Sequence, residues 1–145
     1  MKIRRSIAAA VGAALVGTGA FVLPAFASAS AATHTLKFIS VEKASATLSK
    51  TMSAQQDTDL SSKGKVIGYD DLYFAAISSS AANGWFTLDV DGGFIYGTFK
   101  ISYKTGAITN GKVTGGARAF KGATGTLTAK GVSATRTDVT ITYST

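Results

Sequence analysis

Cysteine is absent from this chain of 145 residues, and proline and histidine each occur once. Without cysteine there is no disulfide framework, no thiolate nucleophile and no cysteine-based metal site. The one histidine, His34, lies close to the expected mature N-terminus, whereas a Ser-His-Asp triad or a zinc site needs a rigid surrounding. We therefore expect neither a conventional hydrolase nor a zinc enzyme, and we expect no metal and no cofactor.

Residues 1–31 have the layout of a secretory signal peptide. Lys2, Arg4 and Arg5 form a basic start, residues 7–23 are an apolar run, and residues 25–32 are mostly small. A membrane anchor is the alternative, since the run is almost long enough to span a bilayer. Cleavage is favoured because the run is rich in Ala and Gly and no basic cluster follows it. The Arg4-Arg5 pair leaves the twin-arginine route open, although its neighbours favour general secretion.

Cleavage leaves one domain, residues 32–145, which we expect to be secreted and to have no membrane contact. It contains twelve basic and eight acidic residues, so its net charge is +4. Its lysines are spread singly along the chain, whereas nucleic-acid binders concentrate basic residues on one face. We therefore expect no nucleic-acid partner.

Short runs of β-branched and aromatic residues, separated by Gly, Asn, Asp and Ser, make up most of this domain. We expect strands at residues 35–41, 65–77, 85–90, 94–103, 107–114, 125–132 and 138–143. The polar stretch 49–64 is interpreted as a long loop with room for one short strand. Turns are expected at residues 91–93, 104–106 and 110–111, because glycine supplies the positive φ that tight turns need.

The run 94–103 shows the alternation of a strand. Ile95, Phe99 and Ile101 share one face, which we expect to contact the core, and Tyr96 and Lys100 share the other. Seven or eight such strands imply a β-sandwich or a β-barrel. Patterning alone leaves that choice open.

The segment 113–127 is expected to be a glycine-rich connection between two strands, with its one aromatic side chain in the core. Its structural glycine motif consists of Gly115, Gly116, Phe120, Gly122 and Gly125. The order Thr-Gly-Gly, an aromatic residue, then Gly-Ala-x-Gly resembles the plant allene oxide cyclases and the related dirigent proteins, whose bacterial relatives carry a similar domain. Residues 65–145 follow the strand order of these families, and residues 33–64 fit them loosely.

The resemblance implies an all-β fold: a closed eight-stranded antiparallel up-and-down barrel, often a homo-trimer, with an apolar pocket at one end. It also implies polar pocket groups, among them a glutamate in the cyclases and aspartates and arginines in dirigent proteins. The strand that would present the glutamate reads Ala75-Ala76-Ile77-Ser78, and Thr124 and Ala117-Arg118 also depart from the dirigent pattern. The resemblance therefore indicates the fold more firmly than the activity.

Four polar residues are candidates for binding a ligand in such a pocket. Asp70 and Asp71 are adjacent, so in a strand only one faces inward, and the alternative is that both are solvated. Tyr96 and Lys100 share a face that looks either into the barrel or toward solvent. Arg118 lies on the glycine-rich segment, where it could contact a carboxylate ligand or be solvated. No residue is identified as catalytic.

Two functions remain open. In the first, the barrel is a secreted, non-catalytic module that binds a small apolar ligand or self-assembles. In the second, it is a cyclase or isomerase that acts on an apolar small molecule by confining it. The missing family carboxylate favours the first, and a buried carboxylate or arginine cluster in a closed apolar pocket would favour the second.

Protein recovered from a culture supernatant is expected to be cleaved between Ala27 and Ala32, because small residues at these positions fit signal peptidase. Intact-mass spectrometry of the secreted protein measures the cleavage position. A full-length chain retained in the membrane fraction would instead support the anchor.

Overall fold

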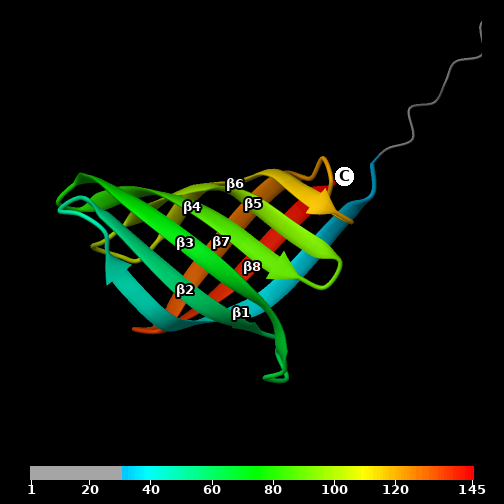
Figure 1. Ribbon diagram of the computed structural model, residues 1–145, viewed down its shortest axis with the longest axis horizontal. Helices are drawn as coiled ribbons and strands as arrows, with labels where there is room; N and C mark the ends of the chain where they lie inside the picture. The colour runs from blue at the N-terminus through cyan, green and yellow to red at the C-terminus, as the bar shows by residue number, and fades with distance from the viewer. Residues whose placement is uncertain (1–30) are drawn as a thin grey trace, which may run out of the picture.

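The computed structural model describes residues 31–145, so the predicted signal peptide, apart from Ala31, lies outside the described residues. Eight antiparallel strands form a closed barrel in which each strand pairs with the next and β8 pairs with β1 (Figure 1). The strands are β1 Thr33–Thr47, β2 Met52–Leu60, β3 Val66–Ser78, β4 Ala81–Val90, β5 Gly93–Ser102, β6 Ile108–Arg118, β7 Thr124–Ser133 and β8 Arg136–Ser144. The predicted closed, eight-stranded, up-and-down barrel is confirmed. Residues 31–145 include no helix long and apolar enough to cross a membrane.

The apolar core lies in the barrel interior, because side chains alternate between the inside and the outside along the strands. On β5, Ile95 and Phe99 are buried while Tyr96 and Lys100 are exposed, so the predicted core face of this strand is confirmed. Side chains of this size each contribute about 1.5–3 kcal/mol when fully buried. The buried apolar cluster draws on six of the eight strands and on the segment between β6 and β7, and it includes Phe38, Phe86, Leu88, Ile95, Phe99, Val113, Phe120, Leu127, Val139 and Ile141.

The stretch 49–64, which the sequence indicates to be mainly a loop, contains the nine-residue strand β2. This strand pairs with β1 and β3 along its length. The interpretation was wrong because the inward face of β2 is polar: Asp57 and Asp59 are buried, where a strand of this kind is expected to place apolar residues. Buried and more exposed positions do alternate along β2, but the buried side chains are polar.

Asn110 and Gly111 do not form a hairpin turn, as their sequence predicts, but lie within β6. Asn110 has a φ of 53°, and the pairing of β6 with β5 shifts register beside it. The dipeptide therefore makes a bulge, which bends the strand. The other two expected turns do connect strands, with positive φ at Gly92 and Gly106.

The glycine-rich segment between β6 and β7 closes one end of the barrel. Phe120 is buried there, and its ring contacts Tyr143 edge-on with centroids 5.6 Å apart. Gly116 lies against Phe120, where a methyl group would overlap the phenylalanine backbone, and Gly122 has a φ of 81°. Gly115 lies under the outward-facing ring of Tyr96. These glycines let the connection fold tightly over the core.

Gly125→Ala is expected to lower the free energy of unfolding by about 1–3 kcal/mol, because a methyl group at this position would overlap the backbone of β8 at Thr142. Gly131→Ala on the same strand is the matched control, since nothing lies within 4 Å of its added methyl group. Urea denaturation of both variants measures the difference. Equal stability would show that β7 and β8 can separate at Gly125 without cost.

Candidate functional site

A cavity of about 160 Å³ lies inside the barrel. Gly106 from the β5–β6 turn and Ala134 and Thr135 from the β7–β8 turn line it, so it reaches the end of the barrel that carries these turns. We call this the open end, and the end covered by Phe120 the closed end. Apolar side chains form most of the wall, among them Phe38, Phe74, Phe86, Phe99, Leu88 and Ile141.

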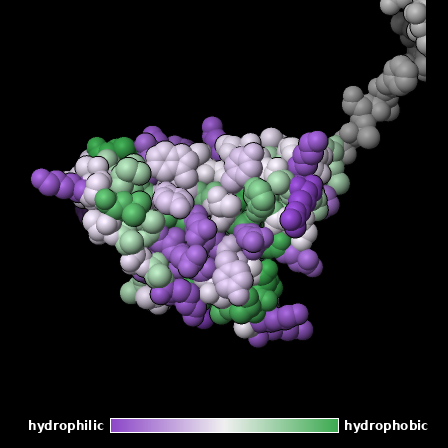
Figure 2. Space-filling model, in the orientation of Figure 1, coloured by the Kyte–Doolittle hydropathy of each residue, from purple (hydrophilic) through white to green (hydrophobic). Residues whose placement is uncertain are grey.

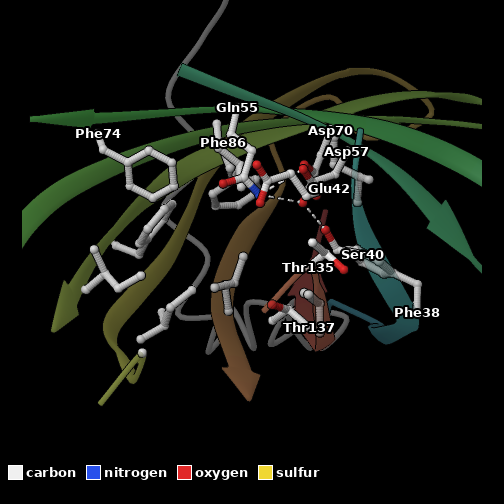
Figure 3. A pocket seen from close by; sticks show the side chains of 18 of the residues that line it. Phe38, Ser40, Glu42, Gln55, Asp57, Asp70, Phe74, Phe86, Thr135 and Thr137 are labelled. Atoms are coloured by element: carbon white, nitrogen blue, oxygen red, sulfur yellow. Dashed lines mark hydrogen bonds between the residues drawn. The ribbon is translucent and has the colours of Figure 1, made fainter. Parts of the chain in front are cut away.

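The acidic lining of the cavity lies on one wall, which comes from the first three strands, and Thr135 and Thr137 add hydroxyl groups from the β7–β8 turn and β8. Ser40 and Glu42 on β1, Gln55 and Asp57 on β2, and Asp70 on β3 all line the cavity. Figure 3 shows the three carboxylates gathered on one side, with the ring of Phe74 on the other. We call Glu42, Asp57 and Asp70 the acid row. None of the described residues that line the cavity is Lys, Arg or His.

The acid row follows from strand register. Glu42 is paired with Asp57 across β1 and β2, and Asp57 is paired with Asp70 across β2 and β3. Side chains directly opposite on neighbouring strands have Cβ atoms about 4.5–5.5 Å apart, and like charges in this arrangement are destabilising. The acid row therefore places acidic side chains next to one another at inward-facing positions, where apolar side chains would make the barrel more stable.

Asp57 is held in place by two hydrogen-bond donors. Gln55 Nε2 donates to Asp57 Oδ1 at 2.8 Å and to Oδ2 at 3.0 Å, and the Ser40 hydroxyl donates to Oδ2. Asp57 itself is 3% exposed. These bonds satisfy the carboxylate of the central member of the row and fix its orientation.

Asp59 has no such donor among the described residues, and Asp70 has the Ser40 hydroxyl beside it, which acts to lower the pKa of Asp70. Asp59 is fully buried and Asp70 is 6% exposed, and no N–H or hydroxyl group within the described residues donates to either oxygen of Asp59 or to Oδ1 of Asp70. The two carboxyls lie within hydrogen-bonding reach of each other. A proton carried by Asp70 and donated to Asp59 is therefore the bond that satisfies this buried pair.

Burial is the main reason that both groups hold protons well above the usual range. It raises the pKa of Asp59 to about 7, with a further contribution from the negative charge of Asp57. It raises the pKa of Asp70 to about 8, and the charges of Asp59 and Asp57 act in the same direction. The hydrogen bond between the pair raises the pKa of Asp70 and lowers that of Asp59, so Asp70 is the proton donor. At neutral pH the cavity thus faces a carboxylic acid.

Of the four binding candidates from the sequence, the structure brings only Asp70 to the cavity. Tyr96 is 42% exposed and Lys100 is exposed, both on the outside of the barrel, because the more apolar set of β5 occupies the interior. Arg118 is exposed at the end of β6, with a φ of 56°, and lies near the closed end. Tyr96, Lys100 and Arg118 therefore take the solvent-facing alternative and lie outside the cavity lining.

Sequence reasoning missed Glu42, Gln55 and Asp57. The signal that could have found them is the spacing of Gln55, Asp57 and Asp59 at alternate positions, which puts all three on one face of a strand. That period-two pattern was hidden because its members are polar and a loop was the simpler interpretation.

The rim of the open end is apolar. Four large hydrophobic side chains near the turns, each more than half exposed, form it: Leu48, Ile77, Tyr103 and Val132. Figure 2 shows hydrophobic side chains at this end of the barrel, at the left of the view, and a second hydrophobic group at the lower right. An apolar rim lowers the cost of moving an apolar molecule from water to the cavity.

Residues 31–145 contain no group of three or more His, Cys, Asp or Glu side chains arranged to hold a metal ion. The acid row spreads along the wall and does not converge on one point.

The fold and the cavity define the class of structure: a closed eight-stranded antiparallel barrel with a partly polar cavity reached from one end. Among solved structures, pyocyanin demethylase has a similar barrel, with a TM-score of 0.61 and 19% sequence identity over 77% of this chain and 100% of that chain. At this identity the likeness shows the fold alone. No protein-family model and no curated protein matches the chain.

The free energy of unfolding is expected to fall as the pH rises from about 4 to about 8. The native state holds protons on Asp59 and Asp70 up to about pH 7 and 8, whereas unfolded aspartates release them near 3.8. Within this window the native state binds more protons, so raising the pH favours unfolding, by at most about 1.4 kcal/mol per pH unit for each group. Urea denaturation at pH 5 and pH 8.5 measures the effect.

Asp59→Asn and Asp70→Asn are expected to weaken this pH dependence. Asp71→Asn is the control, because Asp71 is exposed and accepts a hydrogen bond from Gln56 Nε2 at 3.1 Å on the outside of the barrel. A pH dependence that is the same in all three variants and in the wild type would contradict proton storage at the buried pair.

Proposed function

We propose that the chain is an exported small-molecule-binding barrel whose ligand is mainly apolar and carries one polar group. The cavity that reaches the open end carries this proposal, because its phenylalanine walls suit an apolar body and its one polar wall suits a single polar group. In size it is similar to a buried cavity of about 150 Å³ that admits benzene. A ligand that extends through the open end can be larger.

The resemblance of the glycine motif to allene oxide cyclases and dirigent proteins supports this proposal, because it implies an apolar pocket inside the barrel. The name of pyocyanin demethylase says that this similar barrel acts on a small molecule, pyocyanin. Both support the use of the interior as a binding site.

A second candidate function is an isomerase or cyclase that uses proton transfer. The observation that favours it is Asp70, a buried acid with a pKa of about 8 on the wall of an apolar cavity. An acid with a pKa near the working pH can both donate and accept a proton during a reaction. In this function Asp70 would exchange a proton with the ligand, and Asp59 would stabilise the protonated Asp70 through the hydrogen bond that the two carboxyls share.

Self-assembly, with a homo-trimer as the proposed form, is compatible with either function. It is supported by exposed aromatic side chains on the outside of β3, β4 and β5: Tyr69, Tyr73, Trp85, Phe94 and Tyr96. Aromatic residues are enriched at protein interfaces. The mass of the assembly under native conditions measures this directly.

Native mass spectrometry of the mature protein from culture supernatant is expected to show a small molecule that is released on denaturation. Thr137→Phe should remove it, because Thr137 lines the cavity and the new ring would occupy that space. Thr128→Phe, at an exposed position on β7, is the control and should keep the molecule. A wild-type chain that is bare and that also takes up no toluene from saturated solution would contradict the binding function.

The same preparation separates the two candidates. Asp70→Asn keeps the shape of the side chain and removes its transferable proton, so an isomerase is expected to keep the ligand and lose its conversion. Chromatography of the released molecule after incubation with each protein measures conversion. Release of unchanged ligand by both proteins would favour the non-catalytic binding module.

A further inference from the structure

The cavity has the electrostatic character of a site for positive charge. The acid row provides three acidic groups, and a fourth, Asp59, lies directly behind it toward the closed end of β2. No basic side chain from the described part of the chain lines the cavity. The rest of the domain is basic overall, so the negative character of the interior is a local feature and does not reflect the composition.

Asp70 is the member of the acid row that is best placed to accept hydrogen bonds from a ligand. It is 6% exposed and lines the cavity, and apart from the proton shared with Asp59 its Oδ1 has no donor in residues 31–145. Asp57, by contrast, already accepts hydrogen bonds from Ser40 and Gln55. Oδ1 is shielded on the side of Asp59, so a ligand in the cavity approaches Asp70 at Oδ2, where its N–H groups can donate.

The aromatic walls favour the same sign of charge. Phe38, Phe74, Phe86 and Phe99 all line the cavity. The face of a phenyl ring carries negative partial charge, and it attracts cations within about 6 Å. A ring that presents its face to the ligand therefore adds to the preference for a cation that the acidic groups of the opposite wall create.

An organic cation fits this site better than a metal ion. No set of three or more potential ligands in residues 31–145 is arranged around a metal position. Most of the remaining wall is hydrocarbon, which cannot complete the oxygen shell of a hard cation. A molecule with an apolar body and a nitrogen cation satisfies both parts of the wall.

We propose that the barrel selects small aromatic or apolar molecules that carry a cationic nitrogen, such as an amidinium or a protonated amine, and that this group binds the acid row through Asp70. The inference rests on the proposed binding function and names the chemical class of its ligand. On binding, Asp70 releases to solvent the proton that it holds in the empty cavity, so that the cation replaces it. The nitrogen then donates hydrogen bonds to the Asp70 carboxylate and to the neighbouring acidic groups, while the apolar body contacts the phenylalanine rings.

Three probes of nearly the same shape test the inference: benzamidinium (a cation), benzamide (neutral) and benzoate (an anion). Calorimetric titration of the mature protein is expected to show benzamidinium binding at least about tenfold more tightly than benzamide, with benzoate weakest. A tenfold ratio corresponds to one good charge-assisted hydrogen bond. Equal binding of benzamidinium and benzamide would overturn the inference but leave the binding function in place, whereas no binding of any probe, or of toluene, would overturn both.

Two adjacent aspartates provide a matched pair of variants. Asp70→Asn is expected to reduce the preference for benzamidinium over benzamide to about threefold or less, while binding of benzamide is kept. Asp71→Asn makes the same charge change on the outside of β3 and should leave the preference unchanged. If both variants lower the preference equally, the selectivity comes from the overall charge of the protein and the inference is wrong.

Asp57→Asn gives a second test should Asp70→Asn fail to fold. Asp57 stands between Glu42 and Asp70 in the acid row, and its amide variant can still accept the hydrogen bond from Ser40. The expected result is again a loss of preference for the cation with benzamide binding kept. An unchanged preference in a folded Asp57→Asn protein would overturn the role of the row.

Discussion

The antiparallel pairing of β1 with β8 joins the two ends of the domain over nine residue pairs, from Thr33–Ser144 to Val41–Arg136. This pairing separates an inside from an outside, and every later feature depends on that separation. With no cysteine, the chain has no covalent link that could hold the seam closed. Backbone hydrogen bonds and the interior side chains of β1 and β8, such as Phe38 and Ile141, must do so. The same closure takes the carboxyls of β2 and β3 out of water.

The acid row and the buried Asp59–Asp70 pair oppose the stability of the barrel that contains them. Acidic side chains face one another across β1, β2 and β3, and Asp59 and Asp70 hold protons that they would release in water. An apolar wall of the same size would fold more easily. Costly groups that line a cavity are typical of binding and catalytic sites, where the ligand rather than the fold supplies the missing partner. The interior core on β4 and β5 offsets this cost.

Much of the fold could be predicted from the sequence, and less of the site. Alternation of apolar residues identified the face of β5 that contacts the core, and the glycine motif before β7 indicated a closed barrel. Asp70 was a candidate because adjacent aspartates in a strand must point to opposite faces. Glu42, Gln55 and Asp57 were missed because β2 has a polar interior face, and a strand is recognised most easily by apolar alternation. Asn110-Gly111 was misjudged because a residue with positive φ suits a bulge as well as a turn. Tyr96 and Lys100 show that a mixed face cannot be assigned to a pocket by composition.

The closed end of the barrel determines which part of a bound molecule the proposed site would recognise. Phe120 covers that end, Asp57 and Asp70 lie in the half of their strands nearer to it, and Phe74 lies nearer to the open end. Under the proposed binding function, a molecule that arrives from the open end leads with its polar head, and its tail stays at the rim. The carboxyls of Asp57 and Asp70 would contact the polar head group, whereas the tail would extend through the open end, where no residue blocks it. A barrel that binds in the proposed way would discriminate by head group and tolerate different chain lengths, so its ligands would form a series that shares one head group.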